Sequence, residues 1–506
     1  MLENIQDSFG SLPIMIVVVL LAYFALLLVI SWFTSRKADN QSFFRANKSA
    51  PWFLVAFGMV GTSLSGVTFI SVPGTVGSSH FQYFQVVIGY FIGYFAVAYI
   101  LLPLYYRYNL TSIYTYLQHR FGMASYKTGS LLFIVSRTLG ATLRLYLVIN
   151  VLQIFVLDAL NVPFWATSCL ILLMILLYTF KGGVKTIVWT DTLQTLFMLL
   201  ALVICIGYIL NEFQLLTRSP ISSAINAFSA LSDSGYTEIF NFNVQDKKFF
   251  LKQIIGGAFI TISMTGLDQE MMQKNISVRT LKDSQKNMIT FSLIMVAVNF
   301  VFLLLGGMLY LYAQSKGLDV KGDDIFPTIA MQYLPPVIGL IFIIGLISAL
   351  FPSADGAITA LTASFCIDIL GTQRNAELDE NAQSSVRKKV HLAFTGLFLL
   401  MVLFFKMIDN KEVVSILLDI AGYTYGPLLG LFAFGIFTKH AINDKLAPFV
   451  CLASPAIAFA IDKTSQYWMG GYKFGIEMLA INGILTFVGL MLIRQKAVAE
   501  EPLHAA

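Results

Sequence analysis

Four charged side chains lie within long apolar stretches of this sequence, where charge is rare. Asp355 is near the middle of LISALFPSADGAITALTASF, and Asp191 is in FKGGVKTIVWTDTLQ. Arg137 and Arg144 are seven residues apart, a spacing that puts both on one face of a helix. A charge at the centre of a bilayer costs at least about 2.5–3.5 kcal/mol and usually faces a partner or a cavity. The carboxylates therefore predict a site for a cation or a proton, and the guanidiniums supply positive charge to the same helix bundle.

Three of these charges also have structural interpretations. Asp191 could be an interfacial carboxylate that pairs with Lys185. Arg144 could extend its guanidinium to the outer surface while its stem stays in the apolar region. Arg137 lies deeper, so a contact with substrate or with a counter-charge is favoured. For Asp355 a functional role is favoured most, because an ionised carboxylate near the middle of its helix needs a cation or a proton. Pro352 stands just before it, lacks a backbone N–H and frees a carbonyl around Ser348 or Leu350.

The composition places these charges in a membrane protein. Of the 506 residues, 57% are hydrophobic and 12% are charged, against about 45–50% and about 25% in soluble domains. A bilayer crossing needs about 20 apolar residues. Thirteen stretches meet this criterion, near 14–33, 51–74, 82–104, 125–155, 163–181, 185–211, 250–270, 288–313, 336–370, 390–407, 412–437, 446–463 and 474–493. The prediction is an all-α, multi-pass protein of the plasma (inner) membrane.

The distribution of lysine and arginine predicts the orientation. Twenty of the 33 fall on one set of alternate connections and ten on the other. Cytoplasmic loops are enriched in these residues, so we expect the N-terminus outside and the C-terminus inside. The longest outside connection, 212–249, is either a solvated loop or a short helix over the extracellular mouth.

The helices divide into two halves of opposite orientation. We expect a first helix and cytoplasmic loop in 1–50, one five-helix repeat in 51–211, the extracellular loop 212–249, an inverted second repeat in 250–440, and two further helices with a short cytoplasmic tail in 441–506. Each repeat opens with a helix rich in glycine and hydroxyl residues, 57–74 and 256–266. Paired interrupted helices in inverted repeats predict a binding site near the bilayer midplane, although close helix packing through small residues is the alternative.

Several strings in the chain resemble the sodium:solute symporter family. They are GTSLSGVTFISVPG, FKGGVKTIVWTDTLQ, GLDQEMMQK and GYTYGPLLGLFAFGIF, in this order. The resemblance covers about residues 14–495 and implies the same inverted five-plus-five helix repeat. Members of the family transport sugars, sialic acid, monocarboxylates, proline, vitamins or iodide.

The resemblance also implies a sodium site between the broken first core helix and the eighth. Gly61, Leu64 and Leu350 would contribute backbone carbonyls and Ser353 a hydroxyl, an all-oxygen set that suits a hard cation. Many members have two consecutive hydroxyl residues in the eighth helix, and Pro352 replaces the first of them here. A second cation is implied at Asp191, Asp355 and Ser353, unless one of the carboxylates carries a proton instead.

The first-helix string S-L-S-x-V-T-F-x-S-x-P is more similar to the sialic acid and monocarboxylate branches than to the sugar branch. By this resemblance Arg137 would hold the substrate carboxylate, a role that suits a bidentate guanidinium. The other implied substrate contacts are Ser63, Ser65, Thr68, Gln82 and Gln85. The implied aromatic gates are Phe69, Tyr83, Phe84 and Tyr423.

The predicted function is sodium-coupled import of a small organic solute, a carboxylate or a sugar acid such as sialic acid, by alternating access. Two alternatives on the same fold are a sodium-coupled sugar or polyol symporter and a proton-coupled transporter that uses Asp355 and Asp191. An enzyme is not predicted, because neither aspartate has a histidine or metal-ligand cluster nearby in sequence. We expect the solute, sodium and lipid as partners, with no nucleic acid and no obligate protein partner.

Overall fold

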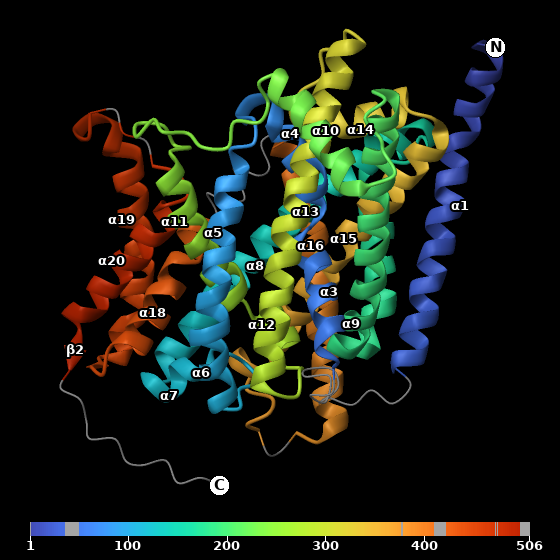
Figure 1. Cartoon of the computed structure of the whole chain (residues 1–506). Coiled ribbons are helices and arrows are strands. Elements are labelled where there is room, and N and C mark those ends of the chain that lie inside the picture. Colours follow the sequence, from blue (N-terminus) through green and yellow to red (C-terminus); the bar gives the residue numbers. More distant parts are fainter. Residues whose placement is uncertain are drawn as a thin grey trace.

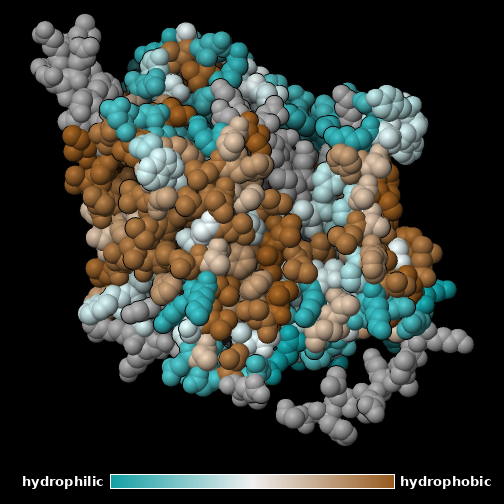
Figure 2. All heavy atoms as spheres, turned by 180° about the vertical axis from the view of Figure 1, so that it is seen from behind, coloured by the Kyte–Doolittle hydropathy of each residue, from teal (hydrophilic) through white to brown (hydrophobic). Residues whose placement is uncertain are grey.

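The computed structural model describes residues 2–35, 50–375, 378–408, 421–470, 472 and 474–495. Most of the long helices run side by side in one bundle (Figure 1). The start of α1 (Leu2–Ser35) and the short strand β2 (Arg494–Gln495) lie at opposite ends of this bundle. Figure 2 shows hydrophobic residues as a broad band around the middle of one face, with hydrophilic residues at both ends. This distribution is that of a chain embedded in a bilayer.

The helices of the first half begin after residue 50. They are α3 (Trp52–Ser63), α4 (Gly66–Ser79), α5 (Tyr83–Ala96), α6 (Leu102–Arg107), α7 (Thr115–Arg120), α8 (Met123–Leu152) and α9 (Phe164–Glu212). The helices from residue 220 onward are α10 (Pro220–Asp233), α11 (Phe250–Thr261), α12 (Gln269–Asn275), α13 (Leu281–Ser315), α14 (Ile325–Thr328), α15 (Pro336–Ser364), α16 (Glu380–Ile408), α18 (Gly426–Phe437), α19 (Ala447–Trp468) and α20 (Met478–Leu492). Strand β1 (Ala441–Ile442) pairs with β2 in antiparallel orientation.

Both predicted interruptions are present as bends. Helices α3 and α4 meet at 57°, and the segment Phe250–Gly266 meets α12 at 69°. At the first break Leu64 and Ser65 leave the helical conformation, with ψ angles of 67° and 176°. At the second break Asp268 caps α12 and accepts hydrogen bonds from the backbone N–H groups of Glu270 and Met271 at 2.9 and 3.2 Å. Each bend leaves backbone groups near the middle of the bundle without a partner along the helix.

The number of crossings agrees with the prediction only in part. Eight described helices are long and apolar enough to span, or up to ten if each bent pair is one span. Three shorter apolar helices, Phe164–Phe180, Ala421–Phe437 and Met478–Leu492, lie where further spans are predicted. The first of them is separated from the rest of α9 by Gly183, whose φ of 54° favours glycine. Residues 412–420 of one predicted span lie outside the described residues. The total of thirteen and the orientation of the termini stay predictions.

The long connection 212–249 contains a helix, so the helical alternative is the one observed. Helix α10 begins after Ser219, whose hydroxyl accepts a hydrogen bond from Ser222 N–H at 3.4 Å. Its buried side chains are Ser223, Ala227 and Leu231, and Leu231 packs against Gly307 of α13. The helix therefore covers one end of the bundle rather than extending into solvent.

Helices α5 and α11 pack closely through glycine. A Cβ added to Gly89 would collide with the carbonyl oxygen of Ile254 and lie 2.9 Å from Ala258 N. A Cβ on Gly257 would collide with the carbonyl oxygen of Val86. Small residues let two helix backbones approach in this way. Both helices contribute side chains to a cavity inside the bundle, which is described below.

We expect Gly89→Val to lower stability by about 1–3 kcal/mol, because the added carbons force the helices apart. The measurement is the thermal unfolding midpoint of the purified protein. Gly396→Val is the matched control, since Gly396 is also helical but a Cβ there would have no atom within 4 Å. Equal midpoints for the two variants would contradict this packing.

Candidate functional site

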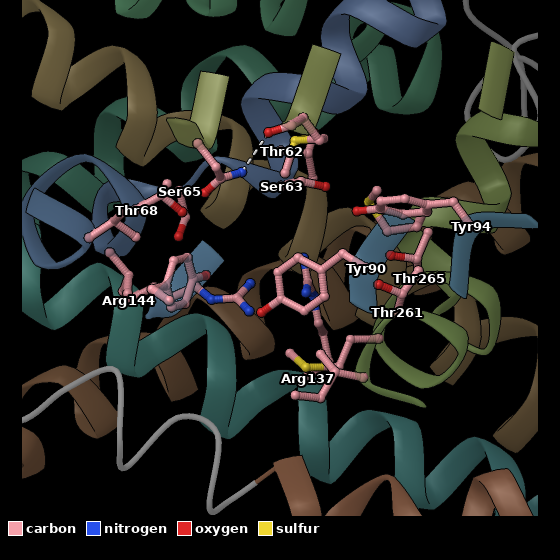
Figure 3. Close-up of a pocket in the computed structure, with 18 residues that line it drawn as sticks. Thr62, Ser63, Ser65, Thr68, Tyr90, Tyr94, Arg137, Arg144, Thr261 and Thr265 are labelled. Atoms are coloured by element: carbon pink, nitrogen blue, oxygen red, sulfur yellow. Dashed lines mark hydrogen bonds between the residues drawn. The ribbon is translucent and has the colours of Figure 1, made fainter. Parts of the chain in front are cut away.

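A cavity of about 110 Å³ lies where the broken helix α3/α4 faces α5, α8 and α11. Its polar lining consists of Thr62, Ser63, Ser65, Thr68, Tyr83, Tyr90, Tyr94, Arg137, Arg144, Thr261, Thr265 and Asn299. Figure 3 shows Arg144, Ser65 and Thr68 on one side of this cavity and Tyr94, Thr261 and Thr265 on the other. The cavity thus combines two cationic groups with many hydroxyls, which fits a solute with an anionic group and several polar groups.

The two arginines of α8 have different partners. Arg137 Nη2 donates to Glu270 Oε2 in an ion pair, and its Nη1 lies 3.7 Å from Asp268 Oδ2. Asp268 Oδ2 also accepts a hydrogen bond from Tyr425 Oη at 2.9 Å. Among the described residues, no carboxylate oxygen lies within 4 Å of the Arg144 guanidinium. The positive charge of Arg137 is therefore compensated within the protein, whereas Arg144 faces the cavity without an ion pair.

These contacts decide between the interpretations of the two arginines. Arg144 lines the central cavity, so the alternative in which it extends to the outer surface is wrong. Arg137 has the predicted counter-charge, and it also lines the cavity. A sequence cannot separate the two roles, because the acidic partners come from α12 and its cap, more than a hundred residues away.

Asp191 forms an ion pair that the sequence analysis missed. Its Oδ2 accepts hydrogen bonds from Lys274 Nζ at 2.7 Å and from Thr62 Oγ1 at 3.1 Å. Lys274 Nζ also donates to Thr62 Oγ1 at 2.6 Å and lies 3.5 Å from Glu270 Oε1. The side chain of Lys274 is only 3% exposed. The alternative in which Asp191 pairs with Lys185 is therefore wrong. Lys274 is one of the twenty cationic residues assigned to the cytoplasmic connections, but it lies inside the bundle.

Asp355 is on α15, the most deeply buried of the long helices. Its Oδ2 accepts a hydrogen bond from Tyr178 Oη at 2.6 Å. Its Oδ1 and Asp191 Oδ1 are both buried and have no hydrogen-bond partner among the described residues. The two carboxylates are close enough to interact electrostatically. Such buried, unpartnered carboxylate oxygens are unusual, and a cation or a proton would satisfy them.

The residues predicted for sodium lie on the two helices expected to carry them. Gly61 and Leu64 form the end of α3 at its break, and Leu350 and Ser353 lie on α15, which packs against α3. All four are buried. Ser353 Oγ donates to the Leu350 carbonyl at 2.8 Å, so these two oxygens are adjacent.

The residues predicted for a second cation have partners within the protein. The side chains of Asp191, Asp355 and Ser353 contact Lys274, Tyr178 and the Leu350 carbonyl respectively. Helix α12 follows the second break and brings the ammonium group of Lys274 to Asp191. The second cation site stays a prediction.

Five predicted contacts lie away from the cavity. Gln82 and Gln85 are at the N-terminal end of α5, where Gln85 Nε2 donates to the Gln82 and Lys248 carbonyls at 3.0 and 3.4 Å. Phe69 packs against Phe302, Phe326 and Phe342. Phe84 contacts Phe300, and Tyr423 donates to Asp462 Oδ2 at 3.0 Å.

Tyr83 is the one predicted gate residue that lines the cavity, and Tyr90 and Tyr94 line it with Tyr83. The three tyrosines are spaced by seven and four residues along α5, so they share one face of the helix. That spacing in the sequence could have identified the set.

A family model identifies the family of the chain. The model of the sodium:solute symporter family matches residues 43–445. The chain belongs to this family. The symporter is 24% identical over 448 residues to the sodium/sialic acid symporter SiaT of Proteus mirabilis, covering 84% of each chain. It is 25% identical over 443 residues to the sodium-coupled monocarboxylate transporter 2 of Danio rerio, covering 86% of this chain and 67% of the relative.

A solved structure shares the fold of the symporter. It is the substrate-bound, outward-open state of a Na⁺-coupled sialic acid symporter, with a TM-score of 0.80 and 20% identity over 96% of this chain and all of that one. The symporter is therefore a multi-pass membrane transporter that couples movement of a small solute to sodium, and the predicted family, class of activity and co-transported ion are confirmed.

Proposed function

We propose that the symporter imports a sialic acid or a related sugar acid together with sodium, and that Arg144 binds the carboxylate of the solute. The observation that carries this proposal is a guanidinium in a hydroxyl-lined cavity with no carboxylate within 4 Å in the described part of the chain. A guanidinium pairs with a carboxylate through two parallel hydrogen bonds. Two of the relatives, from Proteus mirabilis and Aliivibrio fischeri, carry the name sodium/sialic acid symporter.

The hydroxyl groups around Arg144 support a polyhydroxylated acid over a simple one. Ser63, Ser65 and Thr68 come from the break in α3/α4, and Thr261 and Thr265 face them from the second broken segment. Each hydroxyl both donates and accepts hydrogen bonds, so these groups match the hydroxyls of a sugar. Tyr83, Tyr90 and Tyr94 would cover the solute from α5. In this proposal Arg137 holds α12 in place, because Glu270 and Asp268 already occupy its guanidinium.

Sodium would bind at the same break that lines the cavity. Gly61 and Leu64 lie at the break of α3, which packs against α15. Leu350 and Ser353 of α15 would complete the proposed cage, while Ser63 and Ser65 line the solute cavity. Because one irregular segment would serve both ligands, binding of sodium orders the segment that the solute contacts. Such shared ordering favours one conformational state when both ligands are bound.

Ser353→Ala should weaken sodium activation of uptake by about 5- to 12-fold, the equivalent of one hydrogen bond of about 1–1.5 kcal/mol. The measurement is the sodium concentration that gives half-maximal uptake. Ser292→Ala is the matched control, because Ser292 Oγ donates to the Ile289 carbonyl at 2.8 Å in the same i to i−3 pattern on another helix. Unchanged sodium activation in Ser353→Ala would remove this site from the proposal.

The proposed solute class can be tested by thermal stability. The purified protein would be heated with sialic acids, neutral sugars, polyols and monocarboxylates, in sodium and in potassium at equal ionic strength. A ligand that binds the folded state raises the unfolding midpoint, and we expect a shift with a sialic acid only in sodium. A shift with neutral sugars or polyols would support the sugar alternative. A shift that depends on low pH rather than on sodium would support proton coupling through Asp355.

A further inference from the structure

We propose that the ammonium group of Lys274 is a built-in cation that fills a second ion position beside Asp191, so that the symporter binds a single sodium ion. This inference rests on the proposed sodium site at Gly61, Leu64, Leu350 and Ser353 and adds the number of ions that are coupled. Lys274 itself does not line the solute cavity, but its partner Thr62 does.

The surroundings of Lys274 Nζ are those of a monovalent cation. Three oxygens face it, from Thr62 at 2.6 Å, Asp191 at 2.7 Å and Glu270 at 3.5 Å. They come from α3, α9 and α12, three helices far apart in the sequence. A carboxylate and a hydroxyl at short distance are also ligands that sodium accepts. The ammonium therefore takes up charge and space that a second sodium would need.

A mobile ion would find further ligands if the ammonium were absent. Asp191 Oδ1 and Asp355 Oδ1 are buried without a hydrogen-bond partner among the described residues. The two carboxylates also interact electrostatically, and like charges repel. Removal of Lys274 would leave this repulsion and the negative charge of Asp191 uncompensated, and buried charges of that kind recruit a counter-ion or a proton.

Lys274 is also connected to the solute cavity and to the proposed sodium site. Thr62, which accepts its hydrogen bond, lines the cavity and directly follows Gly61. Glu270, its second carboxylate, is packed against Gly356 of α15, one residue after Asp355. An ammonium at this point holds α3, α9 and α12 together in the way that a bound ion would, but it cannot dissociate with the transported sodium.

The simpler interpretation is an ion pair that only stabilises the fold. Both interpretations predict that loss of Lys274 lowers stability, so stability alone does not separate them. They differ in the number of sodium ions bound, because a purely structural ion pair leaves no ion site when it is removed.

The experiment is equilibrium binding of radioactive sodium to the purified full chain, with and without a saturating sialic acid. We expect one sodium ion per protein in the natural sequence and in Lys274→Arg, which keeps the charge. We expect two in Lys274→Met, where Asp191 and Asp355 become available to an ion. We expect one sodium ion again in the double variant Asp191→Asn/Lys274→Met. This variant removes both charges of the pair, so it provides a control even if Lys274→Met alone does not fold.

The outcomes separate this inference from the proposed function. Two sodium ions in the natural sequence, or one in a folded Lys274→Met protein, would overturn the role of Lys274 and leave sodium coupling intact. No sodium bound to the natural sequence would overturn the proposed sodium site itself.

Discussion

Uptake of a sialic acid should fall by about 30-fold or more when Arg144 is replaced by alanine, because truncation of one partner of a desolvated charge pair costs about 2–5 kcal/mol. The solute carboxylate would enter a cavity whose second arginine, Arg137, is already paired with Glu270 and Asp268. No other cation lines this cavity among the described residues. The measurement is the solute concentration for half-maximal sodium-driven uptake.

Two comparisons make this result specific to the solute. Arg144→Lys keeps the charge but loses the planar, two-point contact, so it should restore only part of the affinity. Thermal stabilisation by sodium alone should persist in Arg144→Ala, because the proposed sodium site lies on α3 and α15. Retention of full affinity in Arg144→Ala would show that the carboxylate binds elsewhere.

The second large effect is on stability and concerns Arg137. Arg137→Met should destabilise the protein by about 3–5 kcal/mol, the cost of leaving a buried carboxylate without its partner. Glu270 and Asp268 both face this guanidinium and are buried. The measurement is the unfolding midpoint of the detergent-solubilised protein.

A double variant tests the reason for that loss. Arg137→Met/Glu270→Gln removes the unpaired charge together with the arginine, so it should recover much of the stability. Arg279→Met is the control, because Arg279 is an exposed arginine in the connection after α12. A loss in Arg137→Met that the second substitution does not relieve would contradict the ion-pair explanation.

The broken helices were predictable because their cause is local. Glycine and hydroxyl residues at 57–74 and 256–266 weaken the helix at those points, and the bends occur there or directly after them. Gly183 likewise separates two predicted spans, because its φ of 54° suits glycine and interrupts the helix. Local backbone preferences of this kind can be read from a single sequence.

The ion pairs of the site were not predictable because they depend on tertiary contacts. Lys274 ends the string GLDQEMMQK, which follows a predicted span, so the sequence assigns it to a cytoplasmic connection. Only the fold of α12 back into the bundle brings it within 2.7 Å of Asp191. The same fold supplies Glu270 and Asp268 to Arg137. For similar reasons Phe69 was predicted as a gate but packs among phenylalanines of α13, α14 and α15.

The central claim is that a sodium gradient drives accumulation of an acidic sugar by this chain. The most direct test is uptake of labelled sialic acid into proteoliposomes that contain the purified symporter, with an inward gradient of either sodium or potassium. Accumulation above the external concentration only with the sodium gradient is the expected result. Equal uptake with potassium, or accumulation driven by an inward proton gradient without sodium, would contradict it.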